Sequence, residues 1–167
     1  MKRALFLLFT AIPCALYAQS PVIQTLAYSR QMIPGIPPGP GGASATHNPL
    51  PTSYFLFVVV KKGTSVSTTG ACVQGKWHTA TLKRVAAPVE VDEDPGVPTG
   101  KKRTLVEKTA DDVYRIELQD AQDEACGQHV RGALPQGHDV VVSLQSGGAQ
   151  WLAAAKAIVA LRPAAAP

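Results

Sequence analysis

An uninterrupted run of apolar side chains spans residues 54–60, with the sequence YFLFVVV, and ends at Lys61-Lys62-Gly63. Aromatic and β-branched residues fill most of this run, and these residue types favour pleated β-structure. A strand with one solvated face would alternate apolar and polar side chains, whereas this run does not alternate. We therefore expect residues 54–60 to form a central strand that is buried on both faces.

Weaker strand patterns surround this run, and Gly, Pro, Asn, Asp or Ser residues flank most of them. We expect residues 119–137 to be a polar connection, because no strand pattern continues through them. Segment 64–69 is polar and is expected to be an edge strand. The predicted strand segments are residues 22–28, 64–69, 76–85, 89–91, 104–108, 113–118 and 139–144.

Segment 113–118 alternates regularly and places Tyr114, Ile116 and Leu118 on one face. Such alternation is typical of a half-buried strand in an antiparallel sheet. We expect this segment to pair with segment 104–108 around the polar turn between them.

The C-terminal region fits two kinds of structure. Gly147-Gly148 after a strand pattern predicts a hairpin into residues 151–161. Several alanines in that segment favour a helix, whereas its apolar ending before Arg162-Pro163 favours a strand. We expect a strand.

These short strands, without a convincing interior helix, predict an all-β fold, an antiparallel β-sandwich of the immunoglobulin-like type. The likeness is architectural only, because Trp77 follows Cys72 too closely for the core tryptophan of an immunoglobulin domain. Residues 33–53 contain six prolines and four glycines, which exclude a continuous helix or central strand. The expected organisation is a short first strand plus a long Pro/Gly-rich loop over residues 19–53, the sandwich core over residues 54–163 and a frayed tail over residues 164–167.

Residues 1–18 contain the three parts of a secretory signal peptide in the usual order. Lys2 and Arg3 form a charged start, residues 4–12 are apolar, and Ala18 is a small residue before the expected cut. The apolar part is too short to span a bilayer, and no later segment has the length and apolar character to do so. We therefore expect a secreted or periplasmic protein with no transmembrane segment after signal cleavage.

Cleavage after residue 18 would leave two cysteines, Cys72 and Cys126. Oxidising compartments favour disulfides, so we expect these cysteines to pair. Closing a loop of this length would stabilise the fold by about 4 kcal/mol, if the effect is lost entropy of the unfolded chain. A metal site formed with His78 and His129 is an alternative, but the first spacing is wide and secretion favours the disulfide.

Charge is distributed unevenly, because all 12 acidic residues lie from Glu90 onward. The basic triplet Lys101-Lys102-Arg103 faces the acids of residues 92–94 across an expected hairpin tip, and these acids lack the ligand spacing of a calcium loop. We interpret the triplet as solvated turn charge, with contact to anionic envelope lipid or polysaccharide as the alternative. The basic residues lack interleaved aromatic side chains, so no nucleic-acid partner is expected.

No motif identifies a reaction, a metal or a cofactor, so we expect none of the three. His138 and Asp139 would point to opposite faces of a strand, which argues against a shared catalytic site. The expected function is a non-catalytic domain that binds or scaffolds another envelope component, a protein or a glycan. The alternatives are a carbohydrate- or lipid-binding module and, after it, a small hydrolase. The candidate contact residues are Trp77, Trp151, Lys101, Lys102 and Arg103, although Trp77 suits a core anchor better than a ligand platform.

The mature protein should carry no free thiol, because both remaining cysteines are expected to be oxidised. Alkylation followed by mass spectrometry should modify two cysteines only after reduction, and should place the N-terminus near Gln19. Alkylation of both cysteines before reduction would contradict the disulfide.

Overall fold

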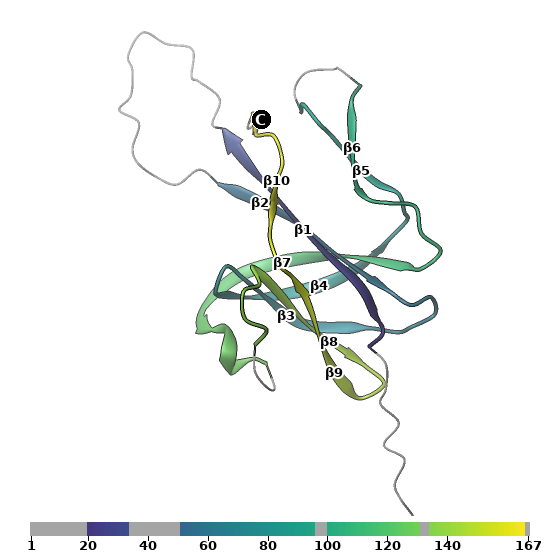
Figure 1. The fold of residues 1–167 in the computed structure, drawn as a ribbon. Helices are drawn as coiled ribbons and strands as arrows, with labels where there is room; N and C mark the ends of the chain where they lie inside the picture. Colours follow the sequence, from purple (N-terminus) through teal and green to yellow (C-terminus); the bar gives the residue numbers. More distant parts are fainter. Residues whose placement is uncertain (1–19, 34–50, 96–99, 131–133, 166–167) are drawn as a thin grey trace, which may run out of the picture.

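The computed structural model describes residues 20–33, 51–95, 100–130 and 134–165. Most of these residues lie in β-strands, and no α-helix occurs among them, which confirms the all-β prediction (Figure 1). The expected signal peptide and residues 34–50 of the Pro/Gly-rich segment lie outside the described residues. The elements are β1 (Val22–Ile33), β2 (Thr52–Val60), β3 (Ser67–Val73), β4 (Lys76–Val85), β5 (Val89–Asp92), β6 (Lys102–Val106), β7 (Asp112–Ala125), the short 3-10 helix η1 (Cys126–Gln128), β8 (Val140–Ser146), β9 (Ala149–Ala155), β10 (Val159–Ala160) and β11 (Ala164–Ala165).

One nine-stranded sheet forms the body of the fold, in the order β10-β1-β2-β7-β4-β3-β8-β9, with β11 also paired to β1. The ladders from β1 to β9 are antiparallel, whereas β10 and β11 run parallel to β1. The sheet curls, so that β1 near one end of this order contacts β9 at the other end. β5 and β6 form a separate two-stranded hairpin (Figure 1).

The largest hydrophobic core, which we call the inner cluster, lies on one face of the curled sheet. In β2, Leu56, Val58 and Val60 belong to it, whereas Phe57 and Val59 between them point to the opposite, outer face. The predicted burial of this strand on both faces is therefore confirmed. The buried members are Ala27, Leu56, Val58, Val60, Ala71, Val73, Ala80, Ile116, Val140, Val142, Leu144, Ala153 and Ala155.

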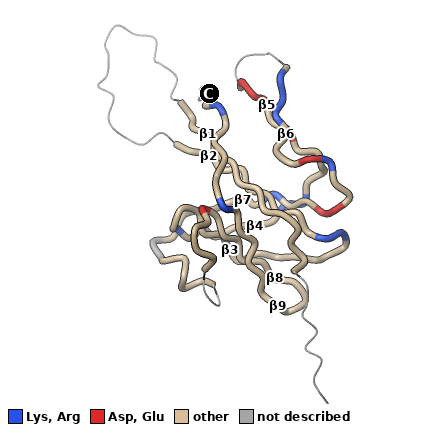
Figure 2. Tube along the Cα trace, viewed as in Figure 1, with Lys and Arg blue, Asp and Glu red and all other residues tan. Residues whose placement is uncertain are grey.

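The β5–β6 hairpin covers the outer face of β1, β2 and β7. The core beneath it, which we call the hairpin cluster, contains Phe57, Val59, Leu105, Val106, Val113 and Leu161. Two hydrogen bonds also attach the hairpin to β1: the Tyr28 hydroxyl donates to the Leu105 carbonyl at 2.7 Å, and Arg30 donates to the Asp92 carbonyl at 2.7 Å. Figure 2 shows acidic and basic residues together on this hairpin.

A second outer core, which we call the disulfide cluster, contains Cys72, Trp77, Cys126, Val130 and Val141. Cys72 and Cys126 form a disulfide with a Cα–Cα distance of 5.6 Å, within the usual range, so the predicted pairing is confirmed. The disulfide also removes both thiolates from the alternative metal set. Through Cys126, it attaches the segment after β7 to the outer face of β3.

Two strand predictions were wrong in their extent. β3 is not an edge strand over residues 64–69, because it continues through Gly70 to Val73 and pairs with both β4 and β8. Its polar side chains fit an interior strand because they find partners, as when the Thr68 hydroxyl donates to the Ser143 carbonyl at 2.7 Å. The expected connection over residues 119–137 begins later, since β7 continues to Ala125 along the full length of β4.

The expected pairing of segments 104–108 and 113–118 was also wrong. β6 pairs with β5, whereas β7 has β2 on one side and β4 on the other. Both edges of β7 are therefore occupied, and β6 lies on the outer face of the sheet instead of beside β7.

The strand prediction for the C-terminal region is confirmed, with one interruption. Gly147 and Gly148 form the hairpin between β8 and β9, both with positive φ angles of 57° and 79°. Residues 156–158 separate β9 from β10, which crosses to β1. The tail is not frayed at its start, because Ala164 and Ala165 pair with β1, and residues 166–167 lie outside the described part.

Gly70→Ala should destabilise the fold, because an added Cβ would lie 2.5 Å from the His78 carbonyl oxygen and 2.5 Å from Cζ2 of Trp77. The contact with backbone cannot relax by a rotamer change, so we expect a loss of about 1–3 kcal/mol in the free energy of unfolding, as for other overpacked sites. Urea denaturation measures this loss. Gly127→Ala is the matched control, since its Cβ would meet nothing within 4 Å. Equal midpoints for the two variants would contradict the close packing of Trp77 on Gly70.

Candidate functional site

A polar groove of about 420 Å³ lies on the outer face of β3, β4, β8 and β9, beside the disulfide cluster. Gly148 and Ala149 of the β8–β9 hairpin close part of its rim. Its remaining walls come from strands distant in sequence, so the groove exists only in the folded chain. The side chains that line it are two threonines, Thr69 and Thr79, three glutamines, Gln122, Gln145 and Gln150, and two aromatic rings, Trp77 and His129.

Trp77 and His129 form a stacked pair at one side of the groove. Their ring centroids are 4.6 Å apart and their planes differ by 4°. Trp77 is only 2% exposed, so the half-buried His129 supplies most of the ring surface that a ligand can touch.

The disulfide places His129 on Trp77. Trp77 is the ladder partner of Cys72, and Cys72 bonds to Cys126 at the start of η1. The His129 N–H then donates to the Cys126 carbonyl at 3.3 Å. Gly70 of β3 has no side chain, and this leaves space for the Trp77 indole from the neighbouring strand β4. The Trp77 and His129 rings are therefore both held next to the Cys72–Cys126 disulfide.

A small hydrogen-bond network supports the part of the groove formed by Thr69 and Gln150. Thr69 donates its hydroxyl hydrogen to the Ser143 hydroxyl oxygen at 3.2 Å, and Nε2 of Gln150 donates to the same oxygen at 2.7 Å. Ser143 is fully buried, whereas Gln150 is half-buried and Thr69 is exposed, so the network leads from the interior to the surface of the groove. The Oε1 atom of Gln150 is buried and has no hydrogen-bond partner among the described residues. The groove therefore contains a hydrogen-bond acceptor that a ligand donor could satisfy.

The alternation of β8 and β9 explains why these side chains gather. Val142 and Leu144 point to the inner cluster, so Ser143 and Gln145 point outward. Gln150 pairs with Gln145 across the hairpin and lies on the same outer face. No Asp, Glu, Lys or Arg is among the described residues that line the groove.

The structure separates the contact residues predicted from sequence. Trp77 lies in the disulfide cluster and lines the groove, whereas Trp151 packs against the inner cluster on the opposite face of the sheet. Lys101, just before β6, and Lys102 and Arg103 at its start are exposed, and the Lys102 ammonium lies 3.9 Å from the Glu90 carboxylate. The two tryptophans and the basic triplet therefore lie in three separate places and do not form one surface.

Sequence reasoning missed the threonines and glutamines of the groove. Strand alternation after Gly147-Gly148 was the available signal, because it would have placed Gln145 and Gln150 opposite each other on one face. Thr69 had no such signal, since its strand was predicted with the wrong end and as an edge strand, whereas it lies between β4 and β8.

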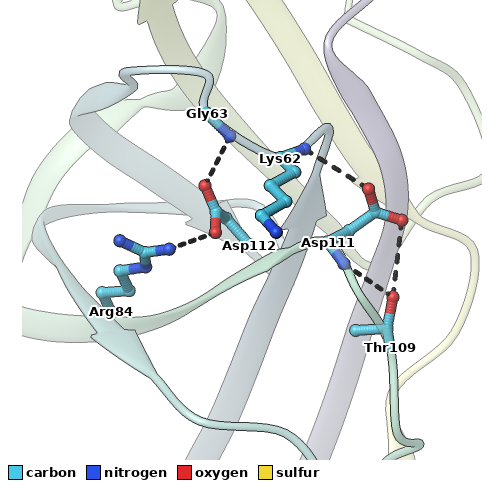
Figure 3. A network of polar contacts seen from close by, with 6 residues as sticks. All are labelled: Lys62, Gly63, Arg84, Thr109, Asp111 and Asp112. Atoms are coloured by element: carbon cyan, nitrogen blue, oxygen red, sulfur yellow. Dashed lines mark hydrogen bonds and ion pairs between the residues drawn. The ribbon is translucent and has the colours of Figure 1, made fainter.

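A second polar assembly joins the β2–β3 turn to the start of β7 (Figure 3). Asp112 is buried there, where one carboxylate oxygen accepts the Gly63 N–H at 2.9 Å and the other accepts a hydrogen bond from Arg84. The neighbouring Asp111 accepts the Lys62 N–H at 3.3 Å. The Gly63 N–H and the Arg84 guanidinium hold the pKa of Asp112 below its usual range. This assembly is a structural clamp between two turns.

His138 and Asp139 have separate partners. Nδ1 of His138 lies 3.0 Å from the Gln136 carbonyl oxygen, and the Asp139 carboxylate accepts the Ile158 N–H at 3.1 Å. No group of three His, Cys, Asp or Glu side chains suited to a metal ion occurs in the part of the chain that the structure describes.

Comparisons with known proteins identify no family for this chain. No protein-family model, no curated protein and no solved structure matches it. Within residues 20–33, 51–95, 100–130 and 134–165, no helix is long and apolar enough to cross a membrane.

Asp112→Asn should weaken the acid dependence of stability. Because its pKa is lowered in the folded state, Asp112 contributes stability above its unfolded pKa of about 4, and this contribution is lost as the pH falls through the lower, folded pKa. The variant should therefore be less stable than the unmodified protein at pH 7, and the difference should shrink toward pH 2. Thermal unfolding across this range measures it. Glu117→Gln, at an exposed position of β7 outside the clamp, is the control, and a pH-independent difference for Asp112→Asn would contradict the clamp.

Proposed function

We propose that the protein is a secreted or periplasmic, non-catalytic domain that binds another component of the cell envelope in its polar groove. The observation that carries this proposal is the buried Gln150 Oε1, an acceptor without a partner among the described residues, in a groove with walls from several strands. A rigid site with an unsatisfied polar group suits binding, because a ligand donor would recover the hydrogen bond lost on burial.

Rigidity of the groove is a further support. The disulfide and the Trp77–His129 stack hold one side, and the buried Ser143 network holds the other. Groups held in place before binding lose less conformational entropy when a ligand arrives. The disulfide also fits an oxidising compartment, which is where the proposed envelope partner would be found.

The chemistry of the groove favours binding over catalysis. Its described lining includes hydroxyls and one imidazole, but no carboxylate to orient that imidazole as a general base. The basic triplet at β6 is a weaker candidate site, since Glu90 and the acids of residues 92–94 lie on the same hairpin.

The sandwich class belongs to the same proposal. One continuous sheet curls so that β1 contacts β9, and both strands contribute to the inner cluster. Two halves of one sheet that share a core in this way would act as the layers of an immunoglobulin-like sandwich, with the groove on the outside of one layer.

Filling the groove should abolish binding to the envelope. Thr79→Arg places a long side chain in the groove, whereas Thr81→Arg places the same side chain two residues further along β4, outside it. We expect the mature protein and Thr81→Arg to be retained on a washed envelope fraction of the secreting cells. Retention of Thr79→Arg should fall about tenfold or more.

Unfolding curves for both variants control for loss of structure. Equal retention of the two folded variants would show that the groove is not the binding site, and would overturn the proposed function.

A further inference from the structure

The groove presents groups that both donate and accept hydrogen bonds. Each primary amide of Gln122, Gln145 and Gln150 carries donor and acceptor atoms. The Thr69 and Thr79 hydroxyls donate their hydrogens to Ser143 and Gln119, so their oxygens are left to accept. A ligand rich in hydroxyl groups has the same dual character at each of its polar atoms. Amides and hydroxyls therefore match such a ligand closely.

The described residues that line the groove include no carboxylate, guanidinium or ammonium group. An anionic ligand would enter a partly desolvated site without a fixed cation, and a cationic ligand would enter it without a carboxylate. Desolvation of an unpaired charge is costly, so both kinds of ligand are disfavoured. The lining that the structure describes therefore favours a neutral partner.

Gln150 offers the groove a hydrogen-bond acceptor that requires a donor on the ligand. Because its Nε2 donates to Ser143 at 2.7 Å, its Oε1 is directed elsewhere and is left buried without a partner among the described residues. A hydroxyl group is a neutral donor that could satisfy this oxygen once the Gln150 side chain turns it toward the groove.

The aromatic side of the groove adds an apolar contact. His129 is stacked on the buried Trp77, is half-buried and lines the groove, so part of its side chain lies within reach of a ligand. Sugar rings combine hydroxyl edges with an apolar face of C–H groups, and this combination fits a groove that has polar walls and one aromatic side. The volume of about 420 Å³ lies within the usual range of small-ligand sites, which suits a terminal sugar unit or a disaccharide.

We propose that the ligand is a neutral glycan of the envelope, held by the glutamine and threonine side chains with a sugar ring against His129. This inference rests on the proposed function, because it names the chemical class of the component that the groove binds. It differs from the basic-turn alternative, which would require an anionic polymer.

Selective destruction of the envelope components tests the class of ligand. The washed envelope fraction is divided into a portion treated with periodate, which cleaves the vicinal diols of sugars, a portion digested with protease and an untreated portion. Retention of the mature, disulfide-bonded protein should be lost after periodate and kept after protease. It should also change little with added salt, because screening acts on charged contacts.

Each opposite result overturns the neutral glycan. Loss after protease, but not after periodate, would identify a protein partner. Loss in moderate salt would identify a charged ligand. If Thr79→Arg still abolishes retention in either case, the groove remains the binding site and only the glycan inference fails. If Thr79→Arg is retained like Thr81→Arg, the proposed function fails as well.

Gln150→Leu gives a second, residue-level test. The change keeps the approximate side-chain volume and removes the buried acceptor together with the Nε2 donor to Ser143, so retention should fall about tenfold. Gln24→Leu on β1, outside the groove, is the matched control and should be retained like the unmodified protein. Full retention of a folded Gln150→Leu variant would overturn the assigned contact.

Discussion

The fold depends on burial of both faces of one curled sheet. Curling of the sheet buries the apolar side chains of its inner face, because β1 and β9 approach each other around the inner cluster. The outer face has no second sheet of comparable size, although β2 presents Phe57 and Val59 there. Apolar side chains on this face would be costly to leave in water. Two short segments cover them: the β5–β6 hairpin and the segment attached by Cys126.

The groove lies where the second cover ends. Along the outward positions of β8, Val141 is in the disulfide cluster, Ser143 is buried in a hydrogen-bond network, and Gln145 lines the groove. The outer face thus changes from apolar to polar over one strand. The disulfide has a double role, because it secures the cover and, through the segment that follows Cys126, holds His129 against Trp77. Stability and the shape of the candidate site come from the same attachment.

Much of the fold was predictable, whereas little of the site was. Strand positions follow from local patterns, as the extents of β2 and β4 illustrate. Strand partners do not follow from local patterns. The 104–108 segment was assigned to β7, but it cannot pair there because β2 and β4 occupy both edges of that strand. The groove shares this limitation, since Thr69, Gln122 and Gln150 come from different ladders whose adjacency no local pattern specifies.

The sequence by itself determined the all-β class, the two-sided burial of residues 54–60 and the pairing of Cys72 with Cys126. Each of these follows from side-chain chemistry or from a period of two along the chain. Only the tertiary structure decided the strand order, the stacking of His129 on Trp77 and the position of the unpaired Gln150 oxygen. The physical reason is that these features depend on which distant strands lie side by side, and that choice depends on burial of apolar area from strands far apart in the sequence.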